Sequence, residues 1–279
     1  MSEISALLDH VVINVHAALD ESAATYRQLG FTLTERGHHS LGSSNHLAMF
    51  GTDYLELLGY EPGREALRPP GFWSQPPGLT GLVFKPPAHG EMESLLAECG
   101  VAALPGNDFS RPVNLPSGPA IAKFRTTALA PDEAPYGRVY FCRHDTPELI
   151  WRREWQQHAN GVDAVAAFTI ATPDPIATAA VYRKMFGTGA MRSVSGGFAL
   201  VTQDGAWVEC LSWEAAAARY AGAILPQEPG VRMVGLALRS QRGAALPGVA
   251  TLAGPGGAVI VPAAAAHGVA LAFVTAMPE

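Results

Sequence analysis

Apolar and polar residues alternate in two N-terminal segments, LDHVVINV (8–15) and YLELLGY (54–60), as in β-strands that bury one face. Each segment places one ionisable side chain among apolar neighbours, His10 in the first and Glu56 in the second. Burying a carboxylate without a partner is costly, so Glu56 requires a cation, a hydrogen-bond network or exposure to water. The two strands therefore mark a candidate polar site within an apolar sheet.

The same pattern returns in the second half of the chain, at 162–172 and 206–213. Glu209 there matches Glu56, whereas Ala164 stands in the position of His10. The repeat keeps its strands and loses one potential ligand. We therefore expect chemistry in the N-terminal half, and we expect Glu209 to face solvent or to pair with an arginine.

The residues between these strands predict the order β-α-β-β-β. In the first unit a helical pattern closes at Gly30, a common left-handed cap, and strand patterns follow at 31–37, 46–50 and 53–59. A second unit opens at 79–85. Its later segments are a helix that stops at Gly100, a loop rich in Pro and Gly at 104–119, and strands at 121–129 and 138–151.

The third unit has a well-marked helix, because Asp174 and Pro175 form an N-cap and first-turn pair and Gly187 follows its end. In the fourth unit, 231–275, the crossover at 239–248 is too short and too rich in Gly and Pro for a long helix. We therefore predict an α+β fold of four βαβββ modules with strongly curved mixed sheets.

The composition is that of a soluble chain with two domains, 1–157 and 158–279. The chain has 279 residues, of which 48% are hydrophobic, and a formal net charge of -6, with no cluster of Lys and Arg suited to nucleic acid. The N-terminus lacks the pattern of a signal peptide, and no apolar run is long enough to cross a membrane. We expect a cytoplasmic protein whose partner is a small molecule rather than nucleic acid or a membrane.

Three residues are candidate metal ligands, because a mononuclear divalent-metal site needs nitrogen and oxygen ligands on rigid elements. They are His10, Glu56 and Glu148, the last of which takes the position of Glu56 in the second unit. His144 lies on the same face as Glu148 if the strand is regular, although Pro147 is poorly tolerated inside a strand. Glu148 and His144 are also the candidate catalytic groups, while a lone strand histidine is more often a core residue than a ligand.

Other residues are candidates for a substrate pocket, although core packing is the commoner use of any single aromatic side chain. Asn14 shares a strand face with the first histidine, and Arg125 could neutralise a carboxylate substrate or pair with a surface acid. His38 and His39, surrounded by Gly and Ser, are expected in a solvent-facing loop. The pocket candidates are Asn14, His46, Trp73, Phe124, Arg125 and Trp151.

Paired βαβββ units with His on the first strand and Glu on the last resemble the vicinal oxygen chelate superfamily. This superfamily includes glyoxalase I, extradiol dioxygenases, methylmalonyl-CoA epimerase and proteins of bleomycin and fosfomycin resistance. The segments LDHVVINV, GHHSLGSSNHL, YLELLGY and ELIW…QHANGV are similar to the glyoxalase-like domain family. The resemblance covers 8–160 and extends over 161–275 as a weaker second copy.

The resemblance implies a divalent metal ion (Zn, Fe, Mn, Ni or Mg) held by four positions of the first two units. Those positions fall on His10, Glu56, Gly81 and Glu148. Gly81 departs from the pattern, which leaves three ligands unless His144 or water fills the fourth place.

Two functions follow from this resemblance. The first is a metal-dependent enzyme of isomerase, lyase or dioxygenase type that acts on a small oxygenated substrate. The second is a metal-free protein that binds or sequesters a small molecule, as in bleomycin resistance, and a third alternative is a purely structural homologue. A homodimer is a further expectation, because such units pair within a chain or between chains.

Overall fold

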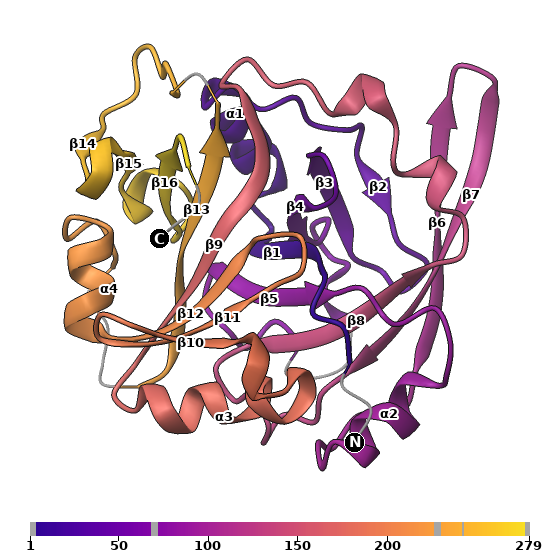
Figure 1. Ribbon diagram of the computed structural model, residues 1–279. Coiled ribbons are helices and arrows are strands. Elements are labelled where there is room, and N and C mark those ends of the chain that lie inside the picture. Colours follow the sequence, from indigo (N-terminus) through magenta and orange to yellow (C-terminus); the bar gives the residue numbers. More distant parts are fainter. Residues whose placement is uncertain (1–3, 68–71, 226–229, 242, 277–279) are drawn as a thin grey trace.

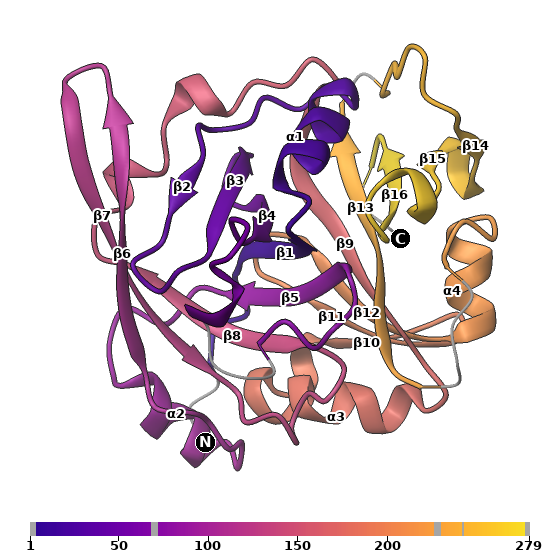
Figure 2. The same cartoon turned by 180° about the vertical axis from the view of Figure 1, so that it is seen from behind.

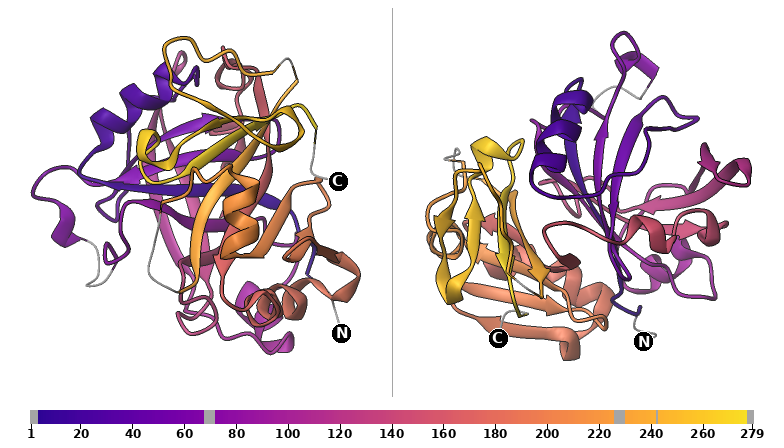
Figure 3. Two further views of the ribbon diagram at one scale, coloured as in Figure 1. Left: turned by 90° about the vertical axis from the view of Figure 1, so that its left-hand side faces the viewer. Right: turned by 90° about the horizontal axis from the view of Figure 1, so that it is seen from above.

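The computed structural model describes residues 4–67, 72–225, 230–241 and 243–276, and it contains two eight-stranded mixed sheets (Figure 1 and Figure 2). Each half of the chain forms one sheet. Seen from above, the two halves form neighbouring lobes (Figure 3, right). The α+β class predicted from the sequence is confirmed.

The first sheet has the strand order β2-β3-β4-β1-β5-β8-β7-β6. Its centre is β1, which runs parallel to β4 and antiparallel to β5, and β5 in turn runs parallel to β8. The strands are β1 (Leu8–His16), β2 (Gly37–His38), β3 (Ser44–Met49), β4 (Tyr54–Gly59), β5 (Gly78–Phe84), β6 (Asn107–Leu115), β7 (Gly118–Ala128) and β8 (Arg138–His144).

The second sheet repeats this arrangement in the order β10-β11-β12-β9-β13-β16-β15-β14. Here β9 runs parallel to β12 and antiparallel to β13. The strands are β9 (Val162–Thr172), β10 (Met191–Val194), β11 (Gly197–Val201), β12 (Trp207–Ser212), β13 (Arg232–Ser240), β14 (Leu252–Ala253), β15 (Val259–Val261) and β16 (Ala270–Val274).

Four α-helices lie in the described ranges, and none of them is long and apolar enough to span a membrane. The predicted cap of α3 is confirmed, since the Asp174 side chain accepts from the backbone N–H of Ala177 at 3.0 Å. The sequence predicted that the crossover at 239–248 is too short for a long helix, and its described residues 239–241 and 243–248 contain no helix. The helices are α1 (Leu19–Gln28), α2 (Met92–Glu98), α3 (Pro175–Phe186) and α4 (Trp213–Arg219).

One apolar core joins the two halves. It includes Val11 and Phe84 of the first sheet and Phe168 and Leu236 of the second. The rings of Phe84 and Phe186, from opposite halves, have centroids 4.8 Å apart. The opposite face of the first sheet carries a separate cluster, which includes Val12, Tyr54 and Tyr140. This face lies away from the shared core and is therefore available for a site.

Two strand predictions are wrong at their ends. The segment 31–37 forms no strand except at its last residue, where β2 begins. The last strand of the second unit ends at His144, and Pro147 begins a short 3-10 helix, η2 (Pro147–Leu149), because proline cannot donate a ladder hydrogen bond. Glu148 therefore does not occupy the strand position of Glu56.

Candidate functional site

His10 projects from the central strand β1 onto the concave face of the first sheet. Its Nδ1 lies 2.6 Å from Asp9 Oδ1, and its Nε2 lies 3.2 Å from the Tyr140 hydroxyl. The Tyr54 ring stacks on the imidazole with a centroid distance of 4.4 Å. These contacts fix the orientation of the ring and leave Nε2 facing the interior of the site.

Glu56 approaches the same point from the neighbouring strand β4. The side chain is buried, and Oε2 lies 3.6 Å from His10 Nε2. Oε1 accepts a 2.6 Å hydrogen bond from Asn45 Nδ2, which also lies 3.2 Å from His39 Nε2. The structure thus brings together the two residues, His10 and Glu56, that the alternating strands had singled out.

Asp9 connects His10 to His144. The register of β1 against β5 shifts between Leu8 and His10, which brings the Asp9 carboxylate to the cavity side, and Asp9 Oδ1 lies 3.0 Å from His144 Nε2. Burial alone would raise the pKa of Asp9, but the imidazoles of His144 and His10 lower it well below its usual range. Asp9 is therefore a carboxylate between two imidazoles, and His144 Nδ1 is buried without a partner.

Asp9, Cys142 and His144 form the one cluster of three potential metal ligands found in the described ranges. Their donor atoms lie within 4.8 Å of one another. Burial raises the pKa of the Cys142 thiol well above its ordinary value, and the negative charges of Asp9 and Glu56 raise it further. Asp9 Oδ1 is already engaged by two imidazoles, so this cluster acts first as support for His10.

The donors around His10 suit a divalent cation better. Nε2 of His10 has Glu56 Oε2 and the Tyr140 hydroxyl within 3.6 Å and 3.2 Å, separations that metal bonds of about 2.0–2.2 Å can bridge. A carboxylate behind the other imidazole nitrogen, here Asp9, is the usual support of a metal-binding histidine.

The sheet register places Tyr140 at the position on β8 that corresponds to Glu56 on β4. Glu56 lies two residues beyond Tyr54, the β4 partner of His10. By the same step on the other side, Tyr140 lies two residues beyond Arg138, the β8 partner of Gly81. Gly81 itself cannot carry a ligand, because a Cβ there would lie 2.7 Å from the Cβ of Val12.

Two adjoining cavities meet this centre. A small one of about 60 Å³ is lined by His10, Glu56 and Arg111, and a larger one of about 580 Å³ is lined by Phe72 and Trp73. The second has the size of a typical small-molecule site. The residues lining both are Leu58, Asn107, Thr126, Arg138 and Tyr140.

The structure places three of the predicted pocket residues at these cavities. Asn14 and Trp73 line the larger cavity, and Phe124 lines the smaller one. Trp151 lines neither cavity and instead packs edge-on against Tyr54, with centroids 5.6 Å apart.

Arg125 and Glu148 lie outside the site. The Arg125 guanidinium pairs with Asp108 at 3.0 Å and with Glu93 at 3.3 Å. The Glu148 side chain is exposed on η2 and lines neither cavity. The structure therefore does not bring Glu148 to His10 and Glu56.

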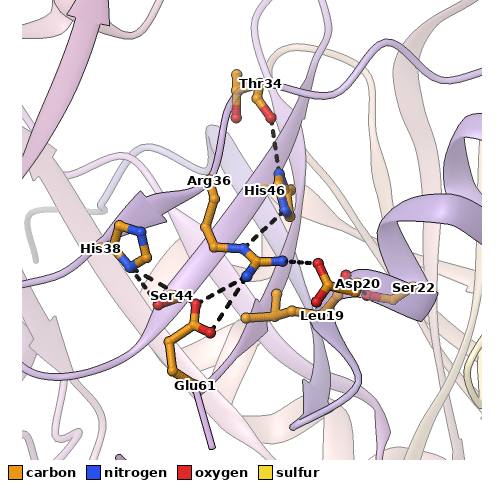
Figure 4. A network of polar contacts seen from close by, with 9 residues as sticks. All are labelled: Leu19, Asp20, Ser22, Thr34, Arg36, His38, Ser44, His46 and Glu61. Carbon is orange, nitrogen blue, oxygen red and sulfur yellow. Dashed lines mark hydrogen bonds and ion pairs between the residues drawn. The ribbon is translucent and has the colours of Figure 1, made fainter.

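His46 lies in a polar network with Thr34 and Arg36 (Figure 4) and lines neither cavity. Its Nδ1 lies 2.9 Å from the Thr34 carbonyl oxygen, and Arg36 Nε donates to its Nε2 at 3.4 Å. Burial lowers the pKa of His46, in accord with its accepting from Arg36. Strand alternation thus removes His46 from the pocket and puts Asn45 there instead.

His39 also differs from its prediction as a solvent-facing residue. It is buried and lines the small cavity, whereas His38 is exposed as expected. Arg111 was not among the predicted site residues, because it belongs to the segment 104–119 that the sequence predicted as a loop; in the structure it lies on β6. Its guanidinium is buried in the wall of the small cavity, with Nη2 lacking a hydrogen-bond partner.

The corresponding position of the second sheet is closed by its own side chains. Glu209 accepts from Arg219 at 2.6 Å and from the Thr169 hydroxyl at 2.8 Å. The expectation that this carboxylate pairs with an arginine is confirmed.

The two mixed sheets, with His10 and Glu56 on neighbouring strands of the first, agree with the resemblance found in the sequence. A model of the glyoxalase-like domain matches residues 8–186, and the chain belongs to that family. No curated protein matches the chain in sequence.

Two solved structures resemble the chain over nearly its whole length and share its fold. One is a hypothetical protein from Staphylococcus aureus, with a TM-score of 0.66 and 10% identity, covering 96% of this chain and 98% of that one. The other is a triple mutant of 4-hydroxymandelate synthase from Streptomyces coelicolor, with a TM-score of 0.54 and 11% identity. That match covers 99% of this chain and 94% of the synthase.

Proposed function

We propose that the N-terminal half is an enzyme that acts on a small oxygenated organic substrate at the centre formed by His10, Glu56 and Tyr140. The observation that carries this proposal is Glu56, which is only 6% exposed and faces His10 Nε2 at 3.6 Å. A carboxylate in such a place is costly unless it serves a ligand or a reaction. The adjoining cavity of about 580 Å³ supplies the space for a substrate.

The side chains suit proton transfer next to an oxygen-bearing carbon. The Glu56 carboxylate, held by Asn45, is positioned to accept a proton from the substrate. Burial, followed by the charge of Glu56, raises the pKa of Tyr140 well above its ordinary value, so its hydroxyl stays protonated at neutral pH. Tyr140 can therefore donate a hydrogen bond to the oxygen on which negative charge develops.

His10 and Glu56 are the residues that would hold a divalent metal ion in this centre, with the Tyr140 hydroxyl beside them as a hydrogen-bond donor. Such an ion, when bound, polarises a substrate oxygen and lowers the pKa of bound water. Asp9 holds the His10 ring in place in either case. Isomerisation, lyase and ring-opening reactions all use these elements, with Zn, Fe, Mn, Ni or Mg as the metal.

The metal content of protein purified without chelators tests this centre. We expect about one equivalent of metal per chain in the wild type and a loss of it in both His10→Ala and Glu56→Ala. Mass spectrometry of metals, with circular dichroism as the check on folding, gives the measurement. Glu148→Ala is the matched control, because this exposed carboxylate should leave the metal content unchanged. Equal metal in the wild type and in the two site variants would rule out the assigned ligands.

A metal-free binding protein is the second candidate. Gly81 has no side chain that could serve as a metal ligand. The cation Arg111 lines the same cavity, and its charge weakens the attraction for a metal ion. Metal-free protein that binds a small aromatic molecule equally well with and without His10 would favour this alternative.

A further inference from the structure

We propose that the small cavity binds the carboxylate group of an organic acid through Arg111 and Arg138, with the apolar body of the acid in the larger cavity. As a statement about the substrate of the enzyme, this inference rests on the proposed function. The binding of an organic acid does not depend on catalysis and can be tested separately.

Arg111 reaches the cavity from β6 and is 4% exposed. No carboxylate oxygen of the described residues lies within 4.0 Å of its guanidinium nitrogens, and Nη2 has no hydrogen-bond partner. A buried guanidinium stays charged, and leaving its charge unpaired is expensive. Arg111 is thus available to bind the anionic group of a ligand.

Gly37 makes room for this arginine. A Cβ at Gly37 would lie 2.8 Å from Arg111 Nη1, 3.0 Å from its Cδ and 2.4 Å from Asn45 Oδ1. The backbone of β2 therefore passes so close to the cavity wall that any side chain would displace the guanidinium. The observed position of the Arg111 guanidinium therefore requires glycine at position 37.

Arg138 lies where the two cavities adjoin and lines both. Its guanidinium carbon lies 4.7 Å from the centroid of Phe72 and 5.0 Å from that of Tyr140. Within the described ranges it forms no ion pair with a carboxylate either, so aromatic faces hold it in position and leave its donors available.

Two arginines of the neighbouring strands β7 and β8 lie outside both cavities and are paired with carboxylates. Arg125 binds Asp108 and Glu93, and Arg143 binds Asp145 at 2.8 Å. These two surface arginines are therefore suitable comparisons for Arg111 and Arg138, because their charges already have partners within the protein.

The charges of the cavity wall favour an anion. Arg111 and Arg138 contribute two positive charges; among the described residues that line the small cavity Glu56 is the one carboxylate, while the Asp9 carboxylate lies behind His10 and outside the lining. A metal ion at His10 and Glu56 would add further positive charge. The preference for an anion holds with and without a metal.

The small cavity has room for a carboxylate group. About 60 Å³ is the space of roughly two water molecules, which suits the two oxygens of a carboxylate. A guanidinium matches a carboxylate with two parallel hydrogen bonds. The apolar residues of the larger cavity, including Phe72, Trp73 and Leu104, then face the rest of the acid.

Calorimetric titration of chelator-treated protein with benzoate, phenylacetate and 3-phenylpropionate tests this proposal, with the matched amides as neutral probes. We expect at least one acid to bind the wild type at least tenfold more tightly than its amide. Arg111→Met and Arg138→Gln should each weaken that acid about tenfold or more and leave the amide unchanged. Gly37→Ala, which keeps both arginines, should weaken the acid as well, and it serves if Arg111→Met does not fold.

Arg125→Gln and Arg143→Gln are the controls, and both should bind the acid like the wild type. The proposal is overturned if no acid binds better than its amide, or if Arg138→Gln and Gly37→Ala retain full affinity. Tighter binding of phenyl phosphate than of every acid would also overturn the assignment of a carboxylate. The titration uses metal-free protein, whereas the metal centre is tested by the metal content of His10→Ala and Glu56→Ala, so failure of the metal centre and failure of the anion site give different results.

Discussion

Asp53→Asn is expected to stabilise the protein at pH 8 and to change its stability little at pH 4. Asp53 lies just before β4, is 3% exposed, and accepts a 2.9 Å hydrogen bond from the backbone N–H of Val165 in the other half. Burial raises the pKa of Asp53 to about 8. An asparagine keeps the acceptor for Val165 and removes the charge.

The direction follows from proton binding. The folded state holds the proton up to about pH 8, whereas the unfolded state releases it near the ordinary aspartate pKa of 3.8. Wild-type stability therefore falls as pH rises between these values, by at most about 6 kcal/mol at about 1.4 kcal/mol per pKa unit. Thermal unfolding of wild type and Asp53→Asn at pH 4 and pH 8 measures the difference. The exposed Asp132→Asn serves as control, and a stability difference between Asp53→Asn and wild type that does not change with pH would contradict the prediction.

Gly81→Ala is expected to destabilise the protein by about 1–3 kcal/mol, because the added methyl group overpacks the sheet. Its Cβ would lie 2.7 Å from Val12 Cβ and 2.8 Å from Val12 Cγ2. The backbone conformation at Gly81 is that of an ordinary strand, so this contact is the source of the cost.

The double variant Val12→Ala/Gly81→Ala isolates the contact. Removing the Val12 methyl groups should recover part of the loss, with a coupling of about 0.5–3 kcal/mol between the two sites in urea unfolding. Gly189→Ala is the matched control, since a Cβ there meets no atom within 4 Å. Additive effects of Val12→Ala and Gly81→Ala would show that the close approach at Gly81 is not limiting.

The sequence predicted the centre of the fold better than its edges. Alternation on β1 and β4 placed His10 and Glu56 correctly, because these strands are regular where they pair in parallel. Asp9 could not be placed this way. Strict alternation predicts that Asp9 and His10 face opposite sides of the sheet, whereas the register shift between Leu8 and His10 brings their side chains together. Glu148 was misplaced because a proline near a strand end does not reveal which residue ends the strand.

Arg111 was missed for a different physical reason. Pro112 beside it is typical of a loop, yet β6 is an edge strand, where a missing N–H costs no ladder hydrogen bond. The strand that carries the cation was therefore predicted as a loop at 104–119. Arg125, one strand inward, was a reasonable choice by residue type, but its surface partners Asp108 and Glu93 depend on tertiary structure.

The core that joins the two sheets determines how the molecule loses its structure. Phe84 and Phe186 pack across the halves, and Asp53 binds the backbone of β9, so neither half can melt without exposing apolar surface of the other. We therefore expect the two halves to unfold together in spite of the boundary predicted near 157. We expect calorimetry to record a single unfolding transition, in which the half without a polar centre shares the stability of the half that has one.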